Sequence, residues 1–284
     1  MREVRMEDRG GWRLAQARPH PALRPFLASY DGYWEDTVVP SRMRTLPGRH
    51  AVVIISLGTP LRLTVPGAGS GHYGTFVSGL YDAHGSYEHP GGQRGVQLDL
   101  TPLGAYTLLG VPMALLTNIA VELADLIGPA AGELVERLAG EPGWPERFDL
   151  LDRFLLHRLE IGPSPAAEVV RAWQVLEATG GMAPVAELAG EVGWSRRHLT
   201  HRFKEQVGLP PKVMARVLRF QRALDLLAGG DPGWAGVAAR CGFYDQAHLN
   251  REFRALAGCT PTELLTQLRP QPLDVGADLV PAPA

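Results

Sequence analysis

The sequence has few of the residues that build disulfides, metal sites and strongly basic surfaces. Its 284 residues include only two cysteines, Cys241 and Cys259, so neither a disulfide framework nor a cysteine-built zinc site is available. Lysine is nearly absent, because only Lys204 and Lys212 occur among the 28 basic residues. The net charge is −2, and as an average over the whole chain this value argues against nucleic-acid binding.

Targeting signals and enzyme motifs are also missing. The longest uncharged stretch, residues 100–121, contains two prolines and two glycines, so it is interpreted as a buried helical connection rather than a membrane span. The N-terminal residues are charged throughout and lack the apolar core of a secretion signal. No nucleophile elbow, phosphate loop, dinucleotide fingerprint or paired-carboxylate pattern occurs. We therefore expect a soluble cytoplasmic protein that is not an enzyme, has no cofactor or metal, and does not bind membranes.

Composition divides the chain into two domains. Residues 1–160 mix strand-like and helical segments, residues 167–269 are helical throughout, and a Gly- and Pro-containing linker at 161–166 separates them. Residues 270–284 are expected to form a disordered tail. The predicted fold class is an α+β N-terminal domain, with a small, mostly antiparallel β portion and helices, followed by an all-α C-terminal domain.

Local patterns predict the elements of both domains. β-Branched and alternating runs predict strands, the first two joined as a hairpin, at residues 50–57, 61–65, 75–80 and 95–100. Leucines spaced three and four apart predict N-terminal helices at residues 133–138 and 147–159. Capping residues and apolar spacing predict C-terminal helices at 167–178, from about Pro184, and at 195–206, 211–228, 234–240 and 245–257.

The C-terminal domain contains one pattern twice. Residues 185–211 match residues 234–261 at an offset of 49 in the first half and 50 in the second. The matched pairs include Ala189/Ala238, Gly193/Gly242, Leu199/Leu249 and Phe203/Phe253. A small residue in the first helix, a glycine in the turn and a Leu–Phe pair in the second helix are typical of a helix-turn-helix. A generic helical bundle is the alternative, but two units in register favour the helix-turn-helix.

The spacing of the two units suits DNA. About eighteen residues of helix between them span roughly 27 Å at about 1.5 Å per residue. This length is near the roughly 34 Å of one turn of B-DNA, so both second helices can enter successive major-groove segments on one face. A single chain can therefore read two half-sites without dimerising.

Three motifs relate the C-terminal domain to a known family. They are Gly193-Trp194-Ser195 with the Leu199/Phe203 pair, Gly242-Phe243 with Gln246, and the closing Gly258-Cys259-Thr260-Pro261. With these motifs, residues 167–268 resemble the tandem helix-turn-helix domain of AraC/XylS-type bacterial transcription regulators. The N-terminal half resembles, more loosely, a sensor-like domain that precedes such modules, through Leu46-Pro47-Gly48, residues 95–102 and the helix at 147–155.

The resemblance implies which residues meet DNA. The expected base-contacting residues are Arg197, Thr200 and His201 in the first unit and Gln246, Ala247, His248 and Arg251 in the second. The expected phosphate-contacting residues, which position the protein without specifying sequence, are Arg196, Arg202, Lys204 and Arg254. The sequence departs from the family at Tyr244-Asp245, where a small polar pair is usual, and at Ala247, which offers only a methyl contact to thymine.

Three further groups of residues have both a structural and a functional interpretation. Cys241 and Cys259 are either redox-sensing or buried, and their small apolar positions favour burial. Three histidines either bind a metal or lie on the surface, and the lack of a His-x-His pair favours the surface for His72, His84 and His89. Six aromatic residues either pack in the core or line a small-molecule pocket, and core packing is the commoner role for residues such as Trp12, Tyr30, Tyr33, Trp34, Tyr81 and Tyr87.

These observations predict a sequence-specific DNA-binding transcription regulator, an activator of the AraC type, at the bacterial nucleoid. Double-stranded DNA is its predicted partner, RNA polymerase and an unidentified small-molecule effector are further candidates, and the chain is a monomer or homodimer. We expect the N-terminal domain to modulate activity through ligand binding or oligomerisation. Two alternatives stay open: an architectural DNA-binding protein without an effector, and a metal-dependent N-terminal enzyme domain fused to a DNA-binding module.

The distribution of charge removes the objection raised by the net value. Residues 181–269 carry 12 Lys and Arg against 8 Asp and Glu, a net charge of +4, which leaves −6 for the rest of the chain. A charge of +4 is modest, so we expect non-specific DNA affinity to be weak and sensitive to salt. The near-neutral total is thus the sum of an acidic part and a mildly basic DNA-binding part.

Overall fold

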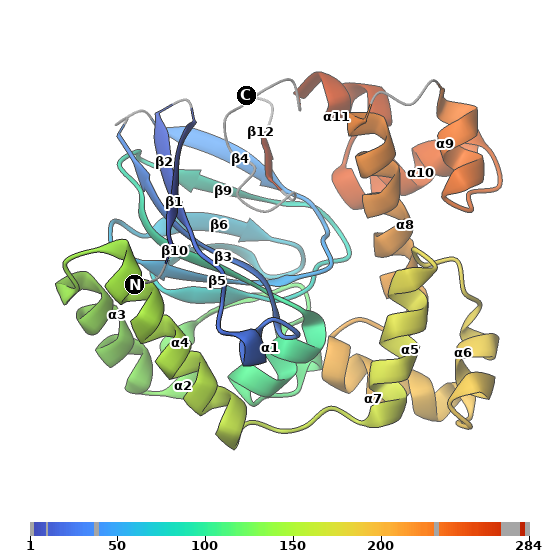
Figure 1. Cartoon of the computed structure of the whole chain (residues 1–284). Helices are drawn as coiled ribbons and strands as arrows, with labels where there is room; N and C mark the ends of the chain where they lie inside the picture. The colour runs from blue at the N-terminus through green and yellow to red at the C-terminus, as the bar shows by residue number, and fades with distance from the viewer. Residues whose placement is uncertain (1–2, 10, 37–39, 230–232, 268–278, 282–284) are drawn as a thin grey trace.

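The chain forms a β-rich N-terminal domain beside a helical C-terminal domain, as the computed structural model in Figure 1 shows. The structure describes all residues except 1–2, 10, 37–39, 230–232, 268–278 and 282–284. The predicted fold class, α+β followed by all-α, is confirmed. In the described part of the chain, no helix combines the length and the apolar character needed to cross a membrane.

Two antiparallel sheets make up the β portion. The seven-stranded sheet contains, in spatial order, β1 (Arg5–Arg9), β2 (Trp12–Gln16), β3 (Leu27–Glu35), β10 (Arg94–Leu100), β5 (Ala51–Ser56), β8 (Phe76–Ser78) and β11 (Ala120–Glu122). The five-stranded sheet contains, in the same sense, β12 (Leu279–Pro281), β4 (Ser41–Thr45), β9 (Gly85–His89), β6 (Leu61–Val65) and β7 (Gly69–Tyr73). The four predicted strands are therefore confirmed as β5, β6, β8 and β10.

The predicted hairpin between β5 and β6 is wrong. β5 pairs with β10 and β8, whereas β6 pairs with β7 and β9 in the other sheet. The chain crosses between the sheets at residues 57–60, because both strands bury apolar side chains in the space between the sheets. Ile54 of β5 and Leu63 of β6 belong to one buried cluster there.

Helices cover the outer face of the larger sheet. They are α1 (Pro102–Leu109), α2 (Leu123–Ile127), α3 (Ala130–Gly140) and α4 (Trp144–Ile161), with short 3-10 turns η1 (Pro21–Leu23) and η2 (Met113–Leu116). Val96 and Leu98 of β10 share a buried cluster with Phe148 of α4. Because side chains alternate along a strand, Gln97 and Asp99 of β10 face the opposite way, into the space between the sheets.

In the described part of the C-terminal domain there are seven helices. They are α5 (Ala167–Ala178), α6 (Val185–Glu191), α7 (Arg196–Val207), α8 (Pro211–Ala228), α9 (Trp234–Arg240), α10 (Gln246–Ala257) and α11 (Pro261–Gln267). The predicted helices are confirmed to within a residue or two, and α11 is additional. The long helix α8 joins the two repeated units, with α7 near one end and α10 near the other (Figure 1).

The predicted tail falls mostly outside the described residues. Of residues 270–284, the described part is Leu279–Pro281, which forms β12 and pairs antiparallel with Met43–Thr45 of β4. Those three residues therefore add a strand to the smaller sheet, next to the surface that faces the C-terminal domain.

Candidate nucleic-acid interface

The two repeated units have matching turns. Gly193 and Gly242 have φ values of 70° and 69°, a region that favours glycine. In the first unit the Trp194 N–H donates to the Ala189 carbonyl at 3.0 Å, and in the second the Phe243 N–H donates to the Ala238 carbonyl at 2.9 Å. The predicted tandem helix-turn-helix is thereby confirmed at the level of individual hydrogen bonds.

Each second helix begins at a side-chain cap. The Ser195 Oγ accepts a hydrogen bond from the His198 N–H at 3.2 Å, and the Asp245 Oδ1 accepts one from the His248 N–H at 2.6 Å. The one-residue slip in the repeat lies in the second turn, where Tyr244 stands between Phe243 and the capping Asp245. Tyr244 is 92% exposed, so the longer turn projects an aromatic side chain beside the start of α10.

A buried Leu–Phe seam orients each second helix. Leu199 and Phe203 of α7 are fully buried, and so are Leu249 and Phe253 of α10. The Phe253 ring packs edge-on against Phe220 of α8 at a centroid distance of 4.8 Å. With these faces packed inward, the polar stripe of each helix is left toward solvent.

The residues predicted to meet DNA lie along these outward stripes. On α7 the exposed members are Arg196, Arg197, His201 and Lys204, and the half-buried members are Thr200 and Arg202. On α10 the exposed members are Gln246, Ala247, Arg251 and Arg254, and His248 is half-buried. Arg202 forms an ion pair with Glu205 at 2.6 Å on the same helix. The structure therefore brings the predicted residues together as two basic stripes, one per unit.

His248 already has partners within the protein. Its Nδ1 accepts a hydrogen bond from the Tyr244 N–H at 3.2 Å, and its Nε2 lies 3.7 Å from a Glu252 carboxylate oxygen. Its ring also packs edge-on against Phe243 at 5.4 Å. These contacts hold the longer turn against α10, a structural role that the sequence did not indicate.

Helix α8 holds the second unit by two arginines. The Arg216 Nε donates to Glu252 of α10 at 2.8 Å. Arg219 lies over the Phe243 ring with its Cζ 5.7 Å from the ring centroid. The 18 residues of α8 correspond to roughly 27 Å of helix, which preserves the spacing argument made from the sequence.

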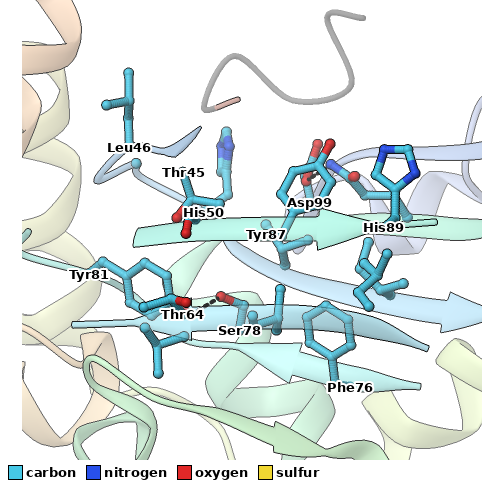
Figure 2. Close-up of a pocket in the computed structure, with 18 of the residues that line it drawn as sticks. Thr45, Leu46, His50, Thr64, Phe76, Ser78, Tyr81, Tyr87, His89 and Asp99 are labelled. Carbon is cyan, nitrogen blue, oxygen red and sulfur yellow. Dashed lines mark hydrogen bonds between the residues drawn. The ribbon is translucent and has the colours of Figure 1, made fainter. Parts of the chain in front are cut away.

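A cavity of about 120 Å³ lies between the two sheets of the N-terminal domain. Figure 2 shows Thr45, Leu46 and His50 toward one end and Tyr87, His89 and Asp99 toward the other. The six aromatic residues weighed in the sequence divide between the two roles. Trp12, Tyr33, Tyr81 and Tyr87 line the cavity. Tyr30 stacks on Phe148 in the core, and Trp34 stacks on Trp144.

Burial controls the ionisation of the polar residues around the cavity. It lowers the pKa of His50 to about 4, with help from the neighbouring Arg49, so the imidazole is neutral at physiological pH. Burial also lowers the pKa of His89, although Glu35 opposes the shift. The pKa of Asp99 is raised by burial, against hydrogen bonds from Gln97 and Ser29 that favour the carboxylate. Among the described residues, no lysine or arginine lines the cavity.

The histidines and cysteines weighed in the sequence occupy separate places. His72 is exposed on β7, His84 lies against Gly258 of the C-terminal domain, and His89 is buried beside the cavity. In the described ranges, no three metal-ligating side chains come together. Both cysteines are buried and unbridged, as their positions predicted, and burial raises the pKa of each thiol.

The N-terminal domain contacts the first unit through α1, η2 and a loop. Leu80 and Leu103 belong to the same buried cluster as Leu199 and Phe203. The Thr117 hydroxyl donates to the Gly208 carbonyl, at the end of α7, at 2.8 Å. Gly79 and Tyr81, on either side of Leu80, line the cavity.

A second contact joins β4 and the loop after it to the other unit. The Arg44 Nη1 donates to the Ala257 carbonyl at 3.0 Å and to the Cys259 thiol at 2.8 Å. Leu46 is buried in the same cluster as Phe253, and it also lines the cavity. Residues beside the cavity thus touch both DNA-binding units.

Sequence reasoning missed the residues that build the cavity floor and the domain contacts. One usable signal was the segment 94–100, where the buried apolar residues of a strand alternate with Gln97 and Asp99. Polar side chains on one face of a fully buried strand point to a cavity or a polar network. Nothing local marked Arg44, Leu46 or Leu80 as contacts between the domains, because their partners lie more than a hundred residues away in the sequence.

Comparisons with known proteins agree with the helix-turn-helix geometry. Residues 188–267 match a family profile described as a helix-turn-helix domain. The chain is similar to the DNA-binding domain of AdpA, solved with a target DNA, at 34% identity over 38% of this chain and 95% of that one, with a TM-score of 0.33. It is similar to an AraC-type regulator domain from Chromobacterium violaceum at 27% identity, over 38% of this chain and 95% of that one, with a TM-score of 0.34.

A longer alignment reaches the N-terminal domain. ToxT from Vibrio cholerae O395 aligns with 81% of this chain and 97% of its own, at 12% identity and a TM-score of 0.48. No curated protein sequence matches the chain. The matched profile and the two helix-turn-helix units together show that the chain is a DNA-binding transcription regulator with a helix-turn-helix domain of the AraC type.

Proposed function

We propose that α7 and α10 read two adjacent major-groove segments of one operator. The observation that carries this proposal is the pair of outward basic stripes, held by matched caps and matched Leu–Phe seams at the two ends of α8. Arg197, Thr200 and His201 would contact bases from the first unit, since side chains near the start of a recognition helix face the base edges and these three can form hydrogen bonds there. Arg196, Arg202, Lys204 and Arg254 would contact phosphates and set the register.

Base readout by α10 rests mainly on Gln246 and Arg251. Both side chains are exposed, and glutamine and arginine can each form two hydrogen bonds with a purine edge. Ala247 would add a methyl contact to thymine. His248 has protein partners at both ring nitrogens, so its contribution is chiefly to hold the turn that carries Tyr244.

The N-terminal domain would modulate DNA binding through its two contacts with the C-terminal domain. Leu80 and Leu46 insert into the buried clusters of the first and second units respectively. Leu46 lines the inter-sheet cavity, and Leu80 lies between Gly79 and Tyr81, which line it. A ligand that moved either loop would therefore change how the units are held relative to each other, and differential binding to two such arrangements is what regulation requires. This arrangement favours a transcription regulator whose DNA binding is regulated over an architectural DNA-binding protein.

Other partners follow from the regulatory role. A regulator of this type acts at the nucleoid, in the cytoplasm, and RNA polymerase is a candidate partner of its DNA-bound form. The two units on one chain suffice for two half-sites, so binding as a monomer is compatible with the proposal, and a homodimer would extend the operator.

Selection of bound sites from random duplex DNA with the full-length chain tests the proposal. We expect two short preferred segments about one helical turn apart. Arg197→Ala should relax preference in one segment and Arg251→Ala in the other, because each substitution removes a base-reading side chain from one unit. Selection of a single segment, or equal relaxation of both segments by either substitution, would contradict the division of labour between α7 and α10.

A further inference from the structure

The inter-sheet cavity has a chemistry that selects its ligand. Building on the proposed regulatory role of the N-terminal domain, we infer that the cavity binds a small molecule with an apolar body and a hydrogen-bond-donating end, an amine or an alcohol, and excludes carboxylates. The argument rests on the size of the cavity, on the acceptor at its floor and on the absence of positive charge among its described lining residues.

The size of the cavity fits a body of about one aromatic ring. Its volume is about 120 Å³, and protein cavities of roughly 150 Å³ lined by apolar side chains admit benzene. The apolar part of the lining includes Ile54, Leu63 and Phe76, which come from both sheets. Burial of a ring against these side chains would provide most of the binding free energy.

Asp99 supplies an acceptor at the floor of the cavity. Its Oδ1 accepts a hydrogen bond from Gln97 at 2.9 Å and its Oδ2 accepts one from Ser29 at 2.8 Å. A carboxylate has about four acceptor positions, so two donors from the protein leave capacity for a ligand. Asp99 pairs with Ser29 of β3 and Val52 of β5, so a central strand of the larger sheet presents the acceptor.

The other polar groups at this end add no positive charge. His89 packs against Trp12 and Tyr87 at centroid distances of 5.8 Å, and its Nδ1 accepts a hydrogen bond from the Gly91 N–H at 3.2 Å. An Nδ1 that accepts belongs to a neutral imidazole. A Glu35 carboxylate oxygen lies 3.4 Å from the same Nδ1. A bound anion would therefore be buried near two acidic side chains, and no lysine or arginine among the described lining residues could pair with it. Burial of an unpaired charge is costly.

Three small molecules that carry the same ring and a positive, neutral or negative end test the inference. Purified full-length protein is heated with 2-phenylethylamine, 2-phenylethanol or phenylacetate, which share a ring and differ in the polar end. At ten times its Kd, a ligand of the folded state raises the Tm of a domain of this size by about 3–5 °C. We expect a rise of this order with the amine and the alcohol and no rise with phenylacetate. A rise with phenylacetate equal to that with the amine overturns the inference. So does the absence of a rise with both the amine and the alcohol at about 10 mM, which is ten times a weak Kd of about 1 mM.

Asp99→Asn locates the acceptor. The substitution keeps the shape and removes the charge, so the Tm rise with the amine should shrink while the rise with the alcohol is kept. Glu136→Gln on α3 removes one exposed acidic group from the same domain and should leave the response to all three compounds unchanged. The wild-type comparison decides the inference even if Asp99→Asn does not fold. Binding of the same samples to the selected operator is measured separately, so a loss of specific DNA binding would count against the proposed function and not against the ligand class.

Discussion

Replacing Arg44 by methionine should loosen the second helix-turn-helix unit from the N-terminal domain. The Arg44 side chain is 7% exposed, and its Nη1 donates to the Ala257 carbonyl and to the Cys259 thiol at the end of α10. Methionine keeps much of the apolar stem and removes the donor. The change therefore tests the polar part of this contact with little loss of packing.

The size of the effect follows from the hydrogen bonds. A hydrogen bond from a charged donor contributes about 1.5–3 kcal/mol, and a thiol is a weak acceptor that adds less. A loss of about 2 kcal/mol shifts an equilibrium between docked and released units roughly thirtyfold, since about 1.4 kcal/mol corresponds to a factor of ten. Leu46 stays buried in the variant, so we expect looser docking rather than complete separation.

Amide hydrogen exchange on the full-length protein measures this shift. Amides at the contact, in residues 46–50 and 257–260, should exchange up to about thirtyfold faster in Arg44→Met, because exchange there follows the population of the released state. Arg42→Met is the matched control on the same strand. Arg42 is 53% exposed and pairs with Glu88 at 3.3 Å, an arrangement that contributes about 0–1 kcal/mol. Equal changes in the two variants, or unchanged protection in Arg44→Met, would show that the Arg44 hydrogen bonds do not hold the second unit against the N-terminal domain.

Four other substitutions test the structure. Arg251→Ala should weaken binding to the selected operator by about 1–3 kcal/mol and relax one base position, whereas Lys204→Ala should weaken all duplexes alike and reduce the slope of log affinity against log salt by about one; equal losses for Arg251→Ala on operator and scrambled DNA in gel-shift titrations would contradict its base-reading role. Phe253→Ala should lower the free energy of unfolding of the C-terminal domain by about 3–5 kcal/mol, because the ring is fully buried against Phe220, and calorimetry would show a lower Tm. His50 has a folded-state pKa of about 4 and an unfolded value near 6.5, so the unfolded chain binds more protons between these values. Stability should therefore fall as pH drops from about 6.5 to about 4, and His50→Gln should show a flatter dependence of Tm on pH; identical curves would mean that the histidine is not buried as neutral imidazole.

The C-terminal domain was predictable because its determinants are local. The cap at Ser195, the glycine at Gly193 and the Leu199/Phe203 pair lie within one short segment, and the second unit repeats them at Asp245, Gly242 and Leu249/Phe253. Helix hydrogen bonds join residues four apart, so capping residues and apolar spacing carry most of the information. Helix α11 was not predicted, and neither was the role of His248, which depends on how the extra residue Tyr244 folds back.

The N-terminal domain was less predictable because its pairings are long-range. Several strands were missed, including β1, β4 and β7, whose sequences are short, charged or rich in glycine and lack apolar alternation. β10 pairs with β3 about 65 residues earlier, and no local pattern specifies that partner. The false hairpin between β5 and β6 has the same origin, since a turn sequence does not say whether the next strand joins the same sheet.

The sequence by itself determined that this chain carries two helix-turn-helix units, which faces of their second helices point outward, and that the positive charge gathers in that domain. These properties depend on periodicity and capping over a few turns of helix. Only the tertiary structure decided that Asp99 and His89 share a cavity, and that Arg44, Leu46 and Leu80 beside it hold both units. Those contacts join segments that are distant in sequence, and their partners are chosen by the packing of sheets and helices rather than by neighbouring residues.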